Sequence, residues 1–323
     1  MNKEIAAIVF SDLHIHKWAK FSTRLDTSLD ILNKLINIST DNNVPLLFCG
    51  DLLHEPNKIE QDLLITLSRV LKELNNKGVK MYGISGNHTL KYTNSIDNHS
   101  ISWDMWISEN FSFFKLIDFS RVHIKNLYIH GIPYIDHNIG LNEYIKNIDT
   151  EVGKPRSKHI LLLHTDYPGA KDTDGIEVNS VENLNINLLD KFDLVLIGHI
   201  HKPQRLSKKV YMVGAPYQQR RTDSNCELGY WELYSDMSMK FIPLKGYPKF
   251  IDVESEGDIK DDGNYYTIIS KPKPIEDKPI KRITTDLSPK RLVKRYLKSK
   301  GEFTKDKKDI LLQLIKDSSD DRI

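Results

Sequence analysis

Nine side chains that can bind metal ions or transfer protons stand at the ends of short apolar runs in this sequence. They are Asp12, His14, Asp51, His54, Asn87, His88, His164, His199 and His201. Imidazole suits manganese, iron, zinc and nickel, whereas carboxylate oxygens suit harder ions. This mixed set exceeds the four ligands that one tetrahedral ion requires. The sequence therefore predicts two divalent ions that share a bridging aspartate, about 3.5–4 Å apart.

The elements that must position these side chains follow from the apolar pattern. Five apolar runs bounded by polar or turn residues predict buried strands. They read IAAIVF, VPLLFCG, VKMYGIS, KHILLLH and FDLVLIG. A helical stripe of Leu25, Leu29, Leu32, Leu35 and Ile36 lies between the first two runs, and a second helical pattern covers 59–74. Alternating strands and helices indicate an α/β layered domain, whose functional groups gather at the carboxyl ends of the strands.

The spacing within two motifs predicts how their side chains point. Residues i and i+2 of an extended strand face the same side. We therefore expect Asp12 and His14 to point together, and His199 and His201 to reach one ion each of the pair. Taken alone, each such residue is more often a turn residue, a helix cap or a structural histidine. Their recurrence at the ends of five apolar runs favours a metal site.

Composition bounds the class of protein. The chain has 323 residues, 39% of them hydrophobic and 28% charged, with a formal net charge of +2. This balance is ordinary for a globular protein and gives no global signal for polyanion binding. Cys49 and Cys226 form neither a zinc nor a disulfide pattern, and no segment reads as a signal peptide or membrane span. We expect a cytoplasmic protein with no membrane partner, from a bacterium or phage with an AT-rich genome.

The ordered motifs DLH, GD, GNH, a lone histidine and GHIH resemble those of the calcineurin-like metallophosphoesterases. The similarity spans residues 5–245 and implies a four-layer α/β/β/α sandwich. It implies that His88 contacts the phosphate and stabilises or protonates the leaving oxygen. The implied ligands are Asp12, His14, Asp51 and His201 for one ion, and Asp51, Asn87, His164 and His199 for the other. We expect Mn²⁺, with Fe²⁺, Zn²⁺ and Mg²⁺ as alternatives.

Within this superfamily, GDLLHEPNK is similar to the SbcD and Mre-type DNA repair nucleases and to the small subunit of phage recombination endonucleases. That branch carries a histidine three positions beyond the bridging aspartate, here His54, which becomes a second catalytic candidate. The turn VGAPYQQ and the short unit after residue 245 resemble the same branch. The resemblance implies a DNA exo- or endonuclease subunit that works with an SMC-like, SbcC-type coiled-coil ATPase. Two departures are Thr89, where an acid usually follows GNH, and the positions of the acids in QQRRTDSNCE.

We expect three segments: a phosphoesterase domain over 1–245, a small capping unit and linker over 246–285, and a basic helical tail over 286–323. Candidates for a DNA-binding surface are Lys202, Arg205, Arg220 and Arg221. Candidates for docking the ATPase are Leu292, Arg295 and Tyr296, which lie in an amphipathic pattern of the tail. The alternatives are a solvated loop for the first set and a solubilising tail for the second. A homodimer stays open.

Two other functions compete with the nuclease. One is a stand-alone phosphoesterase of the same fold that acts on nucleotides or phosphoproteins. The other is a scaffold without catalysis, against which the intact set of candidate ligands argues. His54 and the C-terminal segments favour the nuclease, because a stand-alone phosphatase needs no docking tail.

Overall fold

The structure, a computed structural model, describes residues 3–17, 23–91, 101–135, 140–178 and 184–269. Met1–Ile269 belong to one unit and Ser270–Ile323 to a second. The predicted tail, with Leu292, Arg295 and Tyr296, lies outside the described residues, and the segment boundaries stay predictions. None of the helices in the described ranges combines the length and the apolar character that crossing a membrane requires.

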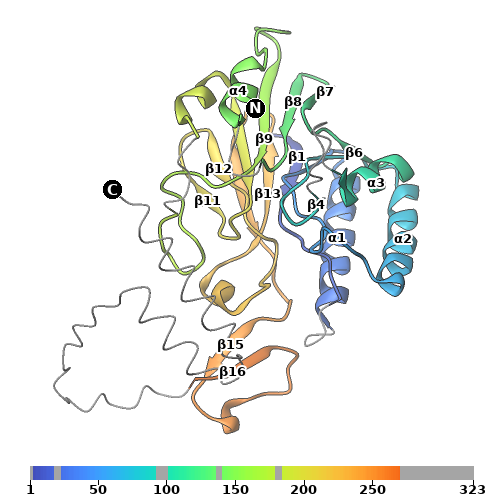
Figure 1. The fold of residues 1–323 in the computed structure, drawn as a ribbon, viewed down its shortest axis with the longest axis vertical. Helices are drawn as coiled ribbons and strands as arrows, with labels where there is room; N and C mark the ends of the chain where they lie inside the picture. The colour runs from blue at the N-terminus through green and yellow to red at the C-terminus, as the bar shows by residue number, and fades with distance from the viewer. Residues whose placement is uncertain (1–2, 18–22, 92–100, 136–139, 179–183, 270–323) are drawn as a thin grey trace, which may run out of the picture. The chain divides into compact units, whose positions relative to one another are not determined.

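Two six-stranded sheets form the centre of the first unit (Figure 1). The first sheet contains, in spatial order, β14 (Met239–Pro243), β13 (Gly229–Tyr234), β1 (Ile5–Phe10), β2 (Leu46–Phe48), β3 (Met81–Gly83) and β6 (Phe114–Leu116). The second contains β11 (Gln204–Arg205), β12 (Val210–Met212), β10 (Leu194–Gly198), β9 (Lys158–His164), β8 (Leu127–Ile132) and β7 (Ser120–Ile124). The strands that precede the candidate ligands pair in parallel within each sheet, so their carboxyl ends share an edge.

Helices cover the outer face of each sheet. They are α1 (Thr23–Asp41), α2 (Gln61–Asn76) and α3 (Trp103–Asn110) on the first sheet, and α4 (Leu141–Asn147) with the 3₁₀ helix η2 (Ile186–Lys191) on the second. Figure 1 shows α1 and α2 side by side. The predicted stripe of α1 faces the sheet, with Leu32 and Leu35 fully buried. The helices and sheets therefore form the predicted four layers in the order α/β/β/α.

The alternation of side chains along β1 explains the layering. Ile8 and Phe10 pack under the helices, whereas Ala7 and Val9 pack between the two sheets. Because successive side chains of a strand point to opposite faces, a strand buried on both faces is apolar throughout. A third core lies between the second sheet and α4, around Leu161. All five predicted strands are confirmed.

Several short elements were not predicted. Ser102 starts α3, because its hydroxyl accepts a hydrogen bond from the backbone N–H of Met105 at 3.0 Å. The remaining short elements are β4 (Leu90–Lys91), β5 (Ile101–Ser102), η3 (Arg221–Asn225) and η4 (Glu256–Asp258). The runs KFIDVE and NYYTIIS, within the segment expected to form the capping unit, form the strands β15 (Phe250–Val253) and β16 (Tyr265–Ile268), which pair in parallel. These two strands are called the cap below.

Candidate metal centre

The structure brings all seven predicted ligands to one edge of the two sheets. Within the first group, His14 Nε2 lies 3.9 Å from an Asp12 oxygen. The ligand atoms of Asp12, His14 and His201 all lie within 4.8 Å of one another. This is the arrangement expected of three ligands around one ion. The group contains three of the four residues assigned by resemblance to the first ion and is called the first position below.

A second group forms around Asn87. The Asn87 amide oxygen lies 3.0 Å from His164 Nε2 and 3.0 Å from His199 Nδ1. His164 Nε2 lies 3.2 Å from an oxygen of Asp51. These four residues match the set assigned by resemblance to the second ion, and the group is called the second position.

Asp51 lies between the two groups. The same carboxylate oxygen that is 3.2 Å from His164 Nε2 lies 3.8 Å from His14 Nε2. The side chain is 1% exposed. A buried carboxylate that faces imidazoles of both groups has the position that a bridging ligand requires. The donor set therefore fits two divalent ions, although the roles of the individual residues stay predictions.

The predicted reason for this convergence is wrong. We expected strand alternation to align Asp12 with His14 and His199 with His201, but β1 ends at Phe10 and β10 ends at Gly198. The backbone φ angles are 52° at Asp12, 48° at His14 and 100° at His199. These values lie in or near the left-handed region, which is uncommon outside glycine and is often found at functional sites. Turns just beyond the strands, rather than alternation within them, direct these side chains to the site.

Glycine is required where the motifs come closest together. A Cβ atom on Gly86 would overlap the Asp51 carboxylate, and one on Gly50 would overlap the His164 ring. Gly50 also has a φ angle of +100°, which a side chain disfavours. The glycines of the GD and GNH motifs therefore let two backbone turns approach side chains of the site.

Two of the four candidate imidazoles are oriented by groups that the motifs themselves supply. His164 Nδ1 lies 2.7 Å from the backbone carbonyl of Cys49, an acceptor, so Nδ1 carries the proton and Nε2 faces Asp51. His14 Nδ1 lies 3.3 Å from His54 Nδ1, which leaves His14 Nε2 toward the aspartates. A partner that fixes one ring nitrogen presents the other nitrogen to a metal.

The other two imidazoles are oriented by carboxylates that sequence reasoning missed. His199 Nε2 lies 3.5 Å from an Asp166 oxygen, and His201 Nδ1 lies 3.3 Å from an Asp223 oxygen. Asp166 follows His164 by two residues, so the motif LLLHTD contained the signal for it. Asp223 belongs to the segment QQRRTDSNCE, whose acids depart from the usual pattern; its sequence position alone does not show that it reaches His201.

Burial and charge set the protonation of the metal-free site. Burial opposes a proton on His164, but the Asp51 carboxylate outweighs this effect and raises the pKa of His164 to about 9. Its partner changes in the opposite sense: burial is outweighed by His164 and then His14, so the pKa of Asp51 is lowered. Burial lowers the pKa of His14 well below its usual value. A metal at the second position must therefore displace a proton from His164.

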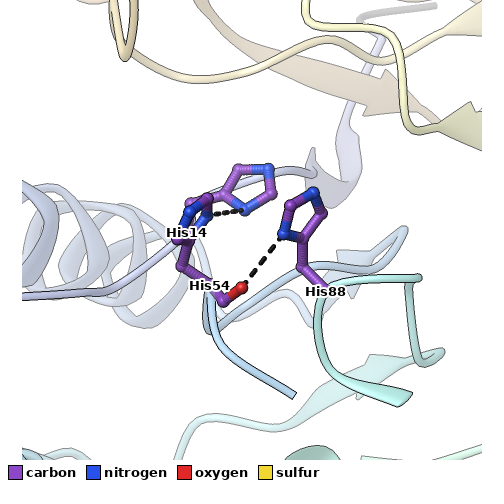
Figure 2. Close-up of side chains that lie close together, drawn as sticks. All are labelled: His14, His54 and His88. Carbon is purple, nitrogen blue, oxygen red and sulfur yellow. Dashed lines mark hydrogen bonds between the residues drawn. The ribbon is translucent and has the colours of Figure 1, made fainter. Parts of the chain in front are cut away.

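His54 and His88 lie beside His14 of the first position, as Figure 2 shows. Their rings stack with centroids 4.7 Å apart and an interplanar angle of 19°. The backbone carbonyl of His54 lies 3.0 Å from His88 Nδ1, which must donate because a carbonyl can only accept. The backbone N–H of His88 donates to Asp51 at 2.8 Å. Both predicted catalytic histidines thus adjoin the candidate ligands.

Thr89 closes the turn that carries Asn87 and His88. It is buried, and its hydroxyl lies 3.1 Å from both the N–H and the carbonyl oxygen of Gly86. The usual acid after GNH is therefore replaced by a hydroxyl that bonds within the turn. The carbonyl of His54 supplies the acceptor that orients His88.

The four predicted DNA-binding residues differ from one another in what their side chains contact. Lys202 is half-buried, and Arg205 donates to the backbone carbonyl of Ser207 at 3.0 Å. Arg220 lies 3.3 Å from Asp223, and Arg221 donates two hydrogen bonds to Asp252 at 2.7 and 2.8 Å. The guanidinium groups of the last two thus pair with acids of the protein. DNA contact by the four residues stays a prediction.

Comparison with known proteins shows the family. The sequence profile of the calcineurin-like phosphoesterases matches residues 6–203, and the chain belongs to that family. A crystal structure of a dimetal phosphatase from Danio rerio is 12% identical, with a TM-score of 0.47; the match covers 72% of this chain and 93% of that one. A hypothetical protein from Thermus thermophilus is also 12% identical, with a TM-score of 0.36, over 66% of this chain and 77% of that one.

Proposed function

We propose that this chain is the nuclease subunit of an SbcCD-like DNA recombination or repair complex and hydrolyses DNA phosphodiester bonds with two divalent ions. Membership of the family supports hydrolysis of phosphoric esters. The observation that carries the step to a nuclease is the position of His54, stacked on His88 beside the first position. The sugar oxygen of a DNA diester leaves as an alkoxide, which requires a proton or a strong hydrogen bond.

The protonation of the two histidines divides their roles. When His14 binds an ion through Nε2, its Nδ1–H donates to His54 Nδ1, so His54 carries its own proton on Nε2. Burial, followed by the neighbouring His88 and His16, lowers the pKa of His54 to about 4. His54 is therefore a neutral hydrogen-bond donor at pH 7. His88 keeps the Nδ1 proton that it donates to the backbone carbonyl of His54, so its doubly protonated form carries the second proton, on Nε2, that passes to the leaving oxygen.

The seven candidate ligand side chains would hold the two ions. When bound, two divalent ions supply a water of lowered pKa and neutralise charge on the phosphate oxygens. Asp51 is 1% exposed and His164 is also buried, so this charge neutralisation acts in a medium less polar than water. The mixture of imidazole, carboxylate and amide donors supports Mn²⁺ as the ion.

The proposal includes two partners. DNA would lie along the basic segment that follows His201, where Lys202 and Arg205 offer phosphate contacts. An SMC-like coiled-coil ATPase would dock on the basic tail. This second partner rests on the sequence resemblance alone.

The test compares diesters with monoesters. The full chain is incubated with Mn²⁺ and end-labelled duplex DNA, bis-p-nitrophenyl phosphate or p-nitrophenyl phosphate. We expect cleavage of DNA and of the diester, and a loss of roughly 10²–10⁴-fold in His88→Asn. The matched control is His123→Asn, which changes an exposed histidine on β7 that stacks on Tyr128. Cleavage of the monoester alone would show that the chain is a phosphatase rather than a nuclease.

A further inference from the structure

The loop 218–223, which includes the start of η3, contacts two residues of the first position. The side-chain amide of Gln219 donates to the backbone carbonyl of Asp12. The carboxylate of Asp223 accepts from His201 Nδ1 at 3.3 Å. Both side chains are buried, Gln219 at 6% exposure and Asp223 at 0%. One loop therefore fixes the backbone of one candidate ligand and the ring orientation of another.

Asp223 is itself held in place. The same oxygen that faces His201 accepts hydrogen bonds from the backbone N–H groups of Gln219 at 2.9 Å and Arg220 at 3.2 Å. Because a backbone N–H can only donate, this oxygen acts as an acceptor toward both groups. This keeps the proton of His201 on Nδ1 and leaves Nε2 for an ion.

The same loop is attached to the cap. The side-chain oxygen of Gln218 accepts from the backbone N–H of Phe250 at 2.8 Å. Arg221 forms the bidentate pair with Asp252, two residues further along β15. A bidentate guanidinium–carboxylate pair fixes orientation as well as distance. The loop 218–223 therefore contacts both the cap strand β15 and the first position.

From these contacts we infer that Asp223 and Gln219 are positioning residues for the metal at the first position, and that Asp252 of the cap positions them through Arg221. The inference rests on the proposed two-metal centre. It names residues outside the ligand motifs and gives the cap a specific task in building the centre.

The first experiment measures Mn²⁺ binding by the full chain for wild type, Asp223→Ala and Asp223→Asn. Electron paramagnetic resonance detects the Mn²⁺ that stays free. Asparagine keeps an oxygen that can accept from His201, whereas alanine does not. Loss of such an outer partner costs roughly 10- to 100-fold in metal affinity. In Asp223→Ala we expect this loss of affinity for one of the two ions. In Asp223→Asn we expect the logarithm of the affinity to fall by less than half as much. Equal losses in both variants, or no loss in either, would overturn the role of Asp223.

The second experiment tests the cap. Asp252→Asn should weaken binding of the same ion by a few fold, and the charge exchange of Arg221→Asp with Asp252→Arg should restore it. The matched control is Asp262→Asn, since Asp262 accepts from Tyr266 at 2.9 Å and has no contact with the loop among those described. If Asp252→Asn binds Mn²⁺ as Asp262→Asn does, the cap has no such task. Thermal unfolding of each variant separates lost folding from lost positioning.

These results are independent of the DNA substrate. If the wild-type chain binds two Mn²⁺ ions but cleaves no DNA, the proposed nuclease function is refuted. The Mn²⁺ binding of the loop variants still tests the positioning role. A chain that cleaves DNA while every loop variant binds Mn²⁺ normally refutes the positioning role alone.

Discussion

Asp104 gives a prediction whose size follows from its surroundings. This residue of α3 is fully buried. Burial raises the pKa of Asp104 to about 8; the Thr89 and Ser85 hydroxyls lower it in part, while Asp118 raises it further. The carboxyl is therefore protonated at neutral pH, next to the turn that carries Asn87 and His88. The perturbation is Asp104→Asn, which is neutral at every pH.

The direction of the pH dependence follows from comparing the protonation of Asp104 in the folded and unfolded states. The ordinary value for this carboxyl is 3.8, so between pH 4 and 8 the folded protein keeps a proton that the unfolded chain has lost. The free energy of unfolding therefore falls as the pH rises, by about 1.4 kcal/mol per pH unit from this group. Between pH 4 and 8 this group lowers the free energy of unfolding by a total on the order of 6 kcal/mol. Asparagine removes this slope.

The assay is urea unfolding of the metal-free protein at pH 5, 6, 7 and 8. The stability of Asp104→Asn relative to wild type should rise by about 1.4 kcal/mol with each pH unit. Asp118, whose pKa burial raises to about 6, adds a slope to both proteins that cancels in the difference. A difference that stays constant from pH 5 to 8 would refute the buried, protonated state of Asp104.

Three further changes separate the roles in the site. His88→Asn should bind Mn²⁺ as wild type does while kcat falls roughly 10²–10⁴-fold, and a parallel loss of metal would contradict its assignment. His54→Ala removes both the partner of His14 and a hydrogen-bond donor, so Mn²⁺ affinity should fall roughly 10- to 100-fold and kcat should fall with it. A lower kcat with unchanged Mn²⁺ affinity would show that His14 needs no partner. Gly86→Ala should destabilise the metal-free protein by about 1–3 kcal/mol in urea unfolding, because its methyl group overlaps Asp51, and unchanged stability would show that the turn can move.

The sequence predicted the parts of the fold that depend on local pattern. The five apolar runs became strands, because a strand buried on both faces must be apolar throughout. The stripe in α1 faced the sheet as its helical period required. The short helices α3 and α4 were missed, since each has fewer than three turns in which a period can show.

For the site, residue types were predictable and their geometry was not. The turns at Asp12, His14 and His199 are stabilised by contacts with distant segments, which no local pattern encodes. The backbone N–H of His199 donates to Asp12, 187 positions earlier in the chain. Asp223 was missed for the same reason, because only the folded loop brings it to His201. Sequence order shows which donors exist, while long-range packing decides which of them meet.

The bridging position of Asp51 is the central claim, and the most direct measurement is the metal content of the chain. Wild type and Asp51→Asn are loaded with Mn²⁺, freed of excess metal, and analysed by mass spectrometry and electron paramagnetic resonance. We predict two Mn²⁺ ions per wild-type chain with an exchange-coupled signal, and loss of that coupling in Asp51→Asn. Fewer than two ions in wild type, or two uncoupled ions that persist in the variant, would contradict a centre built on a shared carboxylate.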